Sequence, residues 1–279
     1  MIKWTTSGHD SHMHLKSLAL KTDLIFANFF GEVIDRGTRL VVKTPTRPDY
    51  FWGNYIVMPQ PPARGSLAEW ISIYNSEFDS KKQGFMTFAV DTPDGAQGAA
   101  QEFRDFGFRC KFDKVLTANS VNPPPKHNAK TEIREIKTDS EWDQLTDVHY
   151  SDDWYLNPDT QLPFLKRELG DLRRMCEAGI GKRFGAFLDG RVVADLGIYA
   201  SSDIGRFNVV ATHRSFRRQG LCGTLVYEAA RLGFETMGVG TLVMVADEHY
   251  HAAAIYESVG FKPTQKLVGF EWFDPSIHG

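Results

Sequence analysis

Apolar positions repeat along the second half of the chain with periods that predict alternating strands and helices. Leu221, Leu225, Ala229 and Leu232 recur at the spacing of one helix face, so a helix is expected to begin near 221 and to end at Gly238. An uninterrupted apolar run over 241–246 predicts a buried strand. The other predicted elements are a strand over 131–137, helices over 141–149 and 164–177, strands over 184–188 and 192–200 joined by a turn at Asp189-Gly190, and a strand over 207–212.

A loop with two arginines and two glycines, Arg217-Arg218-Gln219-Gly220-Leu221-Cys222-Gly223, joins the strand over 207–212 to the following helix. The first turn of a helix has backbone N–H groups without intrahelical partners, and the helix dipole is positive there. Gly220 and Gly223 permit a close approach of the backbone to a ligand, and the arginines add positive charge. This arrangement suits a phosphate group.

The loop resembles the acyl-CoA-binding signature of the GCN5-related N-acetyltransferase (GNAT) family, Arg/Gln-x-x-Gly-x-Gly/Ala. Arg217 holds its first position and Gly220 its fourth, whereas Cys222 replaces the usual Gly or Ala. Downstream, the strand over 241–246 is followed by 252–261, which is similar to the family's last helix and its Tyr-x-x-x-Gly-Phe element. Two matches in the family's order are much more specific than one short motif.

The resemblance implies the α/β (α+β) GNAT fold, a mixed, mostly antiparallel sheet flanked by helices. It also implies acetyl-CoA as co-substrate, bound by the strand before the loop, by the loop and by the helix start. His249 stands where relatives often have an asparagine that contacts the cofactor; the alternative is that it belongs to a helix start. The implied cofactor-binding residues are Val210, Ala211, Thr212, Arg217, Arg218, Gln219, Gly220, Leu221, Cys222, Gly223, Thr224 and His249.

Tyr256 is the catalytic residue that the resemblance implies, as the acid that protonates the departing thiolate. A phenol, with an ordinary pKa of about 10, is only slightly weaker as an acid than a thiol, at about 8.5, so a tyrosine can make this transfer without a large pKa shift. The alternative for Tyr256 is a core tyrosine bonded to the backbone. The proton acceptor is open, because Asn208 and Met244 stand where many relatives have a glutamate. The remaining carboxylates considered for that role, each also readable as a surface or loop residue, are Asp195, Asp203, Glu248 and Glu271.

A Pro/Asn-rich stretch over 119–128 separates two halves, because it can hold neither a helix nor a central strand. The predicted organisation is a first domain over 1–120, a linker over 121–130 and an acetyltransferase domain over 131–279. Residues 99–108 parallel the stretch that ends at Gly260-Phe261, with Phe103 in the place of Tyr256. We therefore expect two tandem GNAT-like domains, of which the first has lost its cofactor signature; chance similarity over ten residues is the alternative.

Composition and charge narrow the function classes. The net charge is −3 and 42% of the 279 residues are hydrophobic, which favours a globular protein over a nucleic-acid-binding one. No membrane-spanning or signal segment is expected, and the location expected is the cytoplasm. Three cysteines without paired spacing indicate free thiols, and His9, His12 and His14 lack the partners of a metal site.

The sequence thus predicts an N-acetyltransferase that transfers an acetyl group from acetyl-CoA to a primary amine, in a small molecule or a protein, by direct attack in a ternary complex. The alternative is a non-catalytic acyl-CoA-binding or regulatory protein, which the missing strand carboxylate permits. The acceptor groove is expected between the first two helices of the fold, around 151–159, and near the final strand at 270–273. Neither a nucleic acid nor a membrane is expected as a partner, and no metal is expected. The sequence leaves the oligomeric state undetermined.

Overall fold

A computed structural model describes residues 13–151, 158–248 and 252–278. Contacts between Cα atoms divide the chain into two compact units. The first unit comprises Met1–Val115 together with Thr264–Gly279, and the second comprises Leu116–Pro263.

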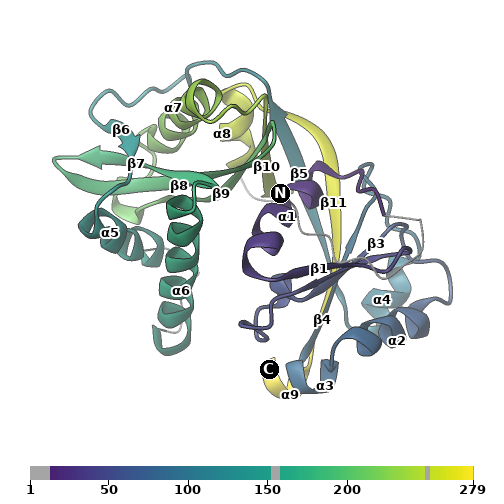
Figure 1. The fold of residues 1–279 in the computed structure, drawn as a ribbon. Coiled ribbons are helices and arrows are strands. Elements are labelled where there is room, and N and C mark those ends of the chain that lie inside the picture. The colour runs from purple at the N-terminus through teal and green to yellow at the C-terminus, as the bar shows by residue number, and fades with distance from the viewer. Residues whose placement is uncertain (1–12, 152–157, 249–251, 279) are drawn as a thin grey trace. The chain divides into compact units, whose positions relative to one another are not determined.

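The second unit is a sheet covered by helices on both faces (Figure 1). Strands β6 to β9 are antiparallel neighbours, and β10 lies parallel to β9. Helices α7 and α8 pack on one face, and α5 and α6 pack on the other. Its elements are β6 (Glu132–Glu135), α5 (Asp139–Tyr150), α6 (Pro158–Glu177), β7 (Gly181–Leu188), β8 (Arg191–Ser201), β9 (Ile204–Thr212), the short helix η2 (Arg214–Phe216), α7 (Leu221–Thr236), β10 (Thr241–Asp247) and α8 (Ala252–Ser258).

Local sequence accounts for most of these elements. The β7–β8 turn places Asp189 at φ 49° and Gly190 at φ 78°, the two left-handed residues that a tight hairpin requires, as predicted. Helix α5 begins in a capping box in which the Thr138 hydroxyl accepts from the Glu141 N–H and the Glu141 carboxylate accepts in return. Every element predicted from the periodicity is present, with ends that differ by a few residues.

In the first unit, neighbouring strands follow the order β1-β2-β3-β4-β11-β5; β3 and β4 are parallel, and the pairs β1–β2, β2–β3 and β4–β11 are antiparallel. Its core is aromatic, with Trp70, Tyr74, Phe88 and Phe103 in mutual ring contact. Its elements are α1 (Leu18–Phe30), β1 (Glu32–Asp35), β2 (Leu40–Lys43), the short helix η1 (Phe51–Gly53), β3 (Tyr55–Met58), α2 (Leu67–Glu77), α3 (Ser80–Gln83), β4 (Phe85–Val90), α4 (Ala100–Phe106), β5 (Arg109–Ala118), β11 (Lys262–Phe273) and α9 (Pro275–His278).

The two halves of the chain repeat one order of elements, as the sequence predicted. A helix joins two parallel strands in each half, α2 between β3 and β4, and α7 between β9 and β10. Each second parallel strand leads to a short helix, after which a left-handed glycine and a phenylalanine introduce a long strand. The glycines are Gly107 at φ 113° and Gly260 at φ 106°. Phe103 is fully buried at the position that corresponds to Tyr256.

The compact units differ from the predicted domains at the C-terminal end of the chain. Strand β11 pairs antiparallel with β4, from Val268 opposite Val90 to Phe273 opposite Phe85. Val268 and Phe270 are buried in the core of the first unit, so 264–279 belongs to it, whereas the sequence grouped these residues with 131–263. The sequence of a strand does not indicate which of several similar strands it will pair with. The predicted domain bounds themselves stay a prediction.

Three further properties bear on function. No helix within the described residues is both long and apolar enough to cross a bilayer. Cys110, Cys176 and Cys222 are free thiols. Among the described residues, His, Cys, Asp and Glu side chains nowhere gather in a group of three that could hold a metal ion.

Candidate active site

A cavity of about 1040 Å³ lies in the second unit, beside the part of β9 that has left its neighbour. The pairing of β9 with β10 extends from Ile204 opposite Thr241 to Arg206 opposite Val243. Residues 209–212 of β9 line the cavity and lie beyond this paired segment. Parallel strands that separate in this way leave a strand edge to which an extended ligand can add.

A bulge in β9 marks the inner end of the cavity. The register between β8 and β9 shifts between Asp195 and Gly197, and Val209 has φ 46°. A β-branched residue in the left-handed region is strained, so surrounding contacts must hold it. One such contact is the hydrogen bond that Arg183 Nη2 donates to the Val209 carbonyl, at 3.2 Å.

The arginine-glycine loop shapes the other end of the cavity. Arg217 Nε donates to the Thr212 carbonyl at 3.2 Å, which ties the loop back to β9. Gly220 caps α7 at φ 81°, and the first intrahelical bond runs from Thr224 N to Gly220 O at 3.1 Å. The amides of 221–223 precede this bond and belong to the helix turn that lacks intrahelical acceptors. Together with Arg217 and Arg218 they form a site suited to a phosphate anion.

The segment predicted as a linker is a wall of this cavity, and no pattern of residues predicts this. Pro124, Pro125 and Lys126 line it. Lys126 Nζ donates to the Arg218 carbonyl at 2.6 Å. Asn128 donates from its side-chain amide to the Gln219 carbonyl at 3.0 Å and from its backbone to Thr224 Oγ1 at 2.8 Å. These bonds tie the segment 124–128 to the arginine-glycine loop and to the start of α7.

The structure brings most of the predicted site residues to one cavity. Gln219 and Thr224 do not line it; both instead bind Asn128 in the wall. His249 lies outside the described residues. Tyr256 on α8 is 7% exposed and lines the cavity. The other predicted residues that line the cavity are Val210, Ala211, Thr212, Arg217, Arg218, Gly220, Leu221, Cys222 and Gly223.

None of the four carboxylates considered as proton acceptor lines the cavity. Asp203 lies in the turn between β8 and β9, where its carbonyl accepts from the amides of Gly240 and Thr241. Glu271 belongs to the first unit and accepts from the indole of Trp52 at 2.8 Å. Asp195 is fully buried next to His149, which does line the cavity.

Arg183, Asp195 and His149 form a buried charged network behind the bulge of β9. Arg183 Nε donates to Asp195 Oδ2 at 2.5 Å, and its Nη2 contacts the same oxygen. His149 Nε2 lies 3.0 Å from Asp195 Oδ1 and 3.2 Å from Arg183 Nη2. The side chains of Arg183 and Asp195 are fully buried, and that of His149 is 3% exposed. Sequence reasoning missed Arg183 and His149, because they look like an ordinary strand arginine and helix-end histidine.

Burial by itself opposes the charge of Asp195. The charge of Arg183, and the hydrogen bonds from Arg183 and His149, together outweigh that effect, so the pKa of Asp195 lies below its ordinary value. Asp195 is therefore ionised in the folded protein at neutral pH. Its charge is compensated by Arg183 within the unit's interior.

Cys222 is expected to resist alkylation despite its place beside the cavity. Burial raises the pKa of its thiol from 9.0 to about 12, so the thiolate fraction at pH 8 falls by about a thousandfold. Iodoacetamide labelling of native protein at pH 8, read by peptide mass spectrometry, should leave Cys222 unmodified, whereas protein unfolded in urea should be labelled fully. Labelling of native Cys222 at the rate seen in urea would contradict this.

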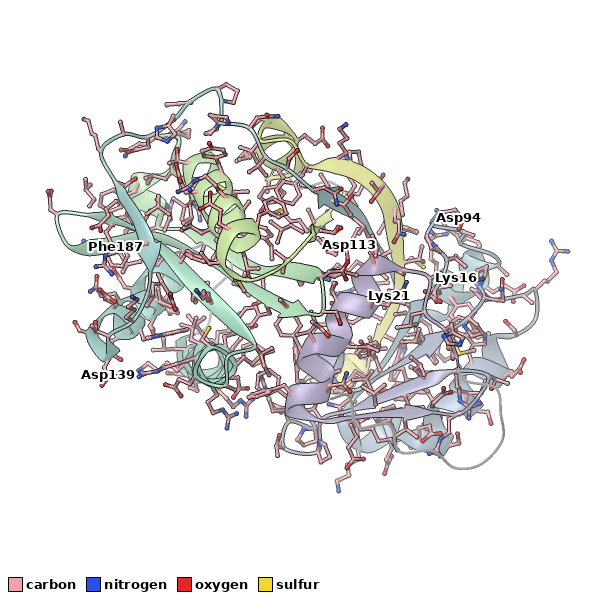
Figure 2. All side chains as sticks on the ribbon, turned by 45° about the horizontal axis from the view of Figure 1, so that its top comes forward. Lys16, Lys21, Asp94, Asp113, Asp139 and Phe187 are labelled. Carbon is pink, nitrogen blue, oxygen red and sulfur yellow. The ribbon has the colours of Figure 1, made fainter. Side chains whose placement is uncertain are left out.

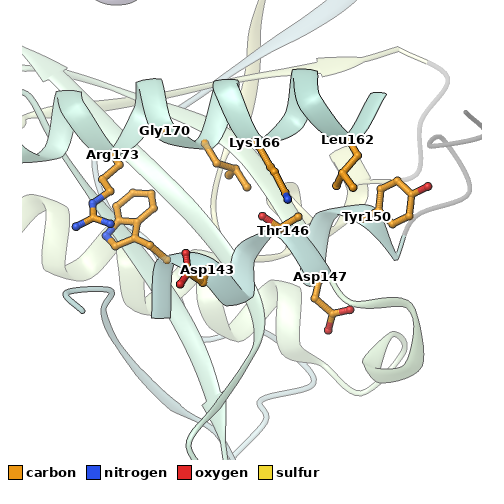
Figure 3. Close-up of a pocket in the computed structure, with 10 residues that line it drawn as sticks. Asp143, Thr146, Asp147, Tyr150, Leu162, Lys166, Gly170 and Arg173 are labelled. Atoms are coloured by element: carbon orange, nitrogen blue, oxygen red, sulfur yellow. The ribbon is translucent and has the colours of Figure 1, made fainter. Parts of the chain in front are cut away.

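A second cavity of about 700 Å³ lies between α5 and α6 (Figure 3). Asp143 and Thr146 on α5 point toward α6, where Lys166 and Arg173 line the cavity, whereas Asp147 points away from α6 and accepts from Arg191 at 2.7 Å. Arg173 is held by Asp139, at the start of α5 in Figure 2, and by Glu177. The acceptor loop is predicted at 151–159, and 152–157 lie outside the described residues.

Comparison with known proteins identifies the part of the chain that carries this site. Residues 143–261 match the model of the Acetyltransferase (GNAT) family. This segment contains β9, the arginine-glycine loop, α7 and Tyr256. The chain matches no curated protein in sequence.

Solved structures resemble the chain over most of its length. A functionally unknown conserved protein from Staphylococcus epidermidis is 12% identical, with a TM-score of 0.69 over 85% of this chain and 91% of that one. A GCN5-related N-acetyltransferase from Kribbella flavida is 15% identical, with a TM-score of 0.61 over 91% and 92%. A tandem GNAT protein from the clavulanic acid biosynthesis pathway is 12% identical, with a TM-score of 0.54 over 91% and 87%. The chain therefore has the tandem GNAT fold that its sequence predicted.

Proposed function

We propose, on the premise that residues 143–261 are a GNAT acetyltransferase domain, that this protein transfers an acetyl group from acetyl-CoA to a primary amine. One observation carries the proposal: a single cavity joins a separated strand edge, a helix N-terminus with two arginines, and a tyrosine hydroxyl. A thioester carrier has a diphosphate, which suits the helix N-terminus with its arginines, and an amide-containing arm, which suits the strand edge. Its thiolate leaving group can take a proton from the tyrosine.

The three parts of the cavity have separate tasks in this proposal. The amides of the first turn of α7, with Arg217 and Arg218, bind the diphosphate. Backbone groups of Val210 to Thr212 pair with the pantetheine arm as with an added strand. These contacts hold the thioester beside the β9 bulge, where a strand N–H stabilises the oxyanion that forms when the amine attacks.

Tyr256 completes the reaction as the acid that protonates the departing thiolate. Its place on α8, across from β9 in the cavity lining, supports this role. The tyrosine gives its proton to sulfur as the C–S bond breaks, and recovers one from the nitrogen of the new amide.

Replacing Tyr256 by phenylalanine tests the proposal. Amine-dependent thiol release should fall about a hundredfold, because general acid catalysis contributes this much, while coenzyme A binding measured by calorimetry stays within twofold. The matched control is Tyr227→Phe, a tyrosine of α7 that does not line the cavity. Equal release by Tyr256→Phe and the native protein would refute the role of the tyrosine.

The competing function is a non-catalytic acyl-CoA-binding protein. Asn208 on β9 and Met244 on β10, where relatives have a carboxylate, favour it. Coenzyme A binding without thiol release for any amine in a panel of amino acids, polyamines, aminoglycosides and peptides would establish this alternative. Under either function we place the protein in the cytoplasm, in keeping with its three free thiols.

A further inference from the structure

The proposed reaction needs a group that takes a proton from the amine. Alkyl amines have pKa values near 10 and arrive protonated at neutral pH, and a protonated nitrogen has no lone pair for attack. Neither Asn208 nor Met244 can accept that proton, and the four carboxylates considered from the sequence do not line the cavity. Of the described residues that line it, His149 is the one whose side chain has an ordinary pKa near neutrality.

We propose that His149 is the proton acceptor for the amine, and that Asp195, held by Arg183, is its positioning residue. This inference rests on the proposed function. It adds a catalytic residue that the family's signature motifs do not contain.

The position of His149 gives it access to the reacting groups. It lies in the last turn of α5 and lines the cavity together with Tyr256 and the β9 residues 209–212. The same arginine that contacts His149 also binds the carbonyl of Val209 in the bulge. His149 is therefore held close to β9, the strand beside which the thioester is placed.

Asp195 is placed to bind His149 once the imidazole has taken the proton. Its Oδ1 is buried beside His149 Nε2. A protonated imidazole has N–H donors at both nitrogens, so Nε2–H then faces the Asp195 Oδ1 that lies 3.0 Å away.

Two further titratable groups beside the network are neutral at physiological pH. Tyr199 of β8 interacts with Arg183 and contacts Cys176 of α6, at 3.8 Å between oxygen and sulfur. Burial raises the pKa of both side chains, so neither competes for the amine's proton. Tyr256 lines the same cavity and is the acid of the later step.

The ammonium gives one proton to His149, and the freed lone pair forms the C–N bond at the thioester carbon. The C–S bond then breaks, the thiolate takes the proton of Tyr256, and the phenolate takes the excess proton of the amide nitrogen. His149 returns its proton to solvent, so one ammonium and one thioester yield one amide, one thiol and one proton.

Replacement of His149 by glutamine tests the inference, because glutamine keeps a similar size and cannot accept the proton at neutral pH. The acceptor used is whichever of lysine, spermidine, tobramycin and a lysine peptide supports the fastest thiol release by the native protein. At pH 7 we expect kcat/KM for His149→Gln to fall about a hundredfold, with coenzyme A affinity within twofold. Activity should recover as the pH approaches the pKa of the amine, where free base becomes available.

The controls separate a chemical role from a structural one. His213→Gln removes another histidine beside an aspartate, Asp147 at 3.7 Å, outside the cavity lining, and should leave the pH profile unchanged. A His149→Gln enzyme with native kcat/KM and pH profile would overturn the inference and leave the proposed function standing. So would a loss of activity by the same factor at every pH. No thiol release by the native protein with any of the four amines would overturn both.

Discussion

Replacing Asp195 by asparagine is expected to lower the free energy of unfolding of the protein by about 3–5 kcal/mol, since it leaves Arg183 as a buried charge without its counterion. Neither side chain is accessible to water, so water cannot compensate the charge that remains. Urea unfolding at pH 7, followed by circular dichroism, measures the difference. A change below about 1 kcal/mol would mean that solvent or another group compensates Arg183.

The same pair predicts how stability depends on pH. The pKa of Asp195 is lower in the folded protein than in the unfolded chain, so its contribution is present above the unfolded pKa, about 3.9, and is lost as the pH falls through the folded value. As the pH falls below 5, the free energy of unfolding should therefore decrease more for the native protein than for Asp195→Asn. Parallel curves for the two proteins would contradict the depressed pKa.

A double substitution is the control for the ion pair. Arg183→Met with Asp195→Leu removes both charges and keeps apolar volume, and such replacements are often neutral in stability. We expect the double variant to be more stable than either Arg183→Met or Asp195→Asn. If it is as unstable as their sum, packing rather than unpaired charge accounts for the loss.

Replacing Gly220 by alanine is expected to weaken coenzyme A binding about a hundredfold, the cost typical of an ångström-scale displacement of positioning groups. Gly220 has φ 81°, and a Cβ at this residue lies 2.4 Å from the backbone oxygen of Lys126. Both the helix start and the wall segment must shift to admit it, which moves the amides that bind the diphosphate. Isothermal calorimetry with coenzyme A measures the affinity.

Gly238→Ala is the matched control for Gly220→Ala. Gly238 follows α7 at φ 68°, but nothing lies within 4 Å of an added Cβ. This variant carries a similar backbone cost, about 1 kcal/mol, without a clash and outside the cavity lining. It should bind coenzyme A as the native protein does. Equal affinity of Gly220→Ala and Gly238→Ala would show that the loop does not bind the diphosphate.

Local patterns were sufficient to predict the elements that flank the arginine-glycine loop. The helical spacing of Leu221, Leu225 and Ala229 and the glycine before it gave α7 and its start within a residue. The Asp189-Gly190 turn gave the β7–β8 hairpin. These elements are predictable because the residues that determine them are neighbours in sequence.

Contacts between distant residues decided the rest of the site. His149, Arg183 and Asp195 come from a helix and two strands, and no spacing in the chain marks them as a network. The segment over 124–128 reads as a linker by composition, and its role as a wall depends on bonds to Arg218 and Gln219 about ninety residues away.

The sequence by itself determined the order of strands and helices, the repeat of that order in the two halves, and the loop that begins α7. Only the tertiary structure decided that β11 joins β4, that residues 124–126 of the linker line the cavity, and that a buried histidine lines it too. The physical reason is the range of the interactions. Helix starts and tight turns are fixed by backbone sterics and hydrogen bonds among neighbouring residues, whereas strand partners and buried charges depend on which surfaces folding brings together.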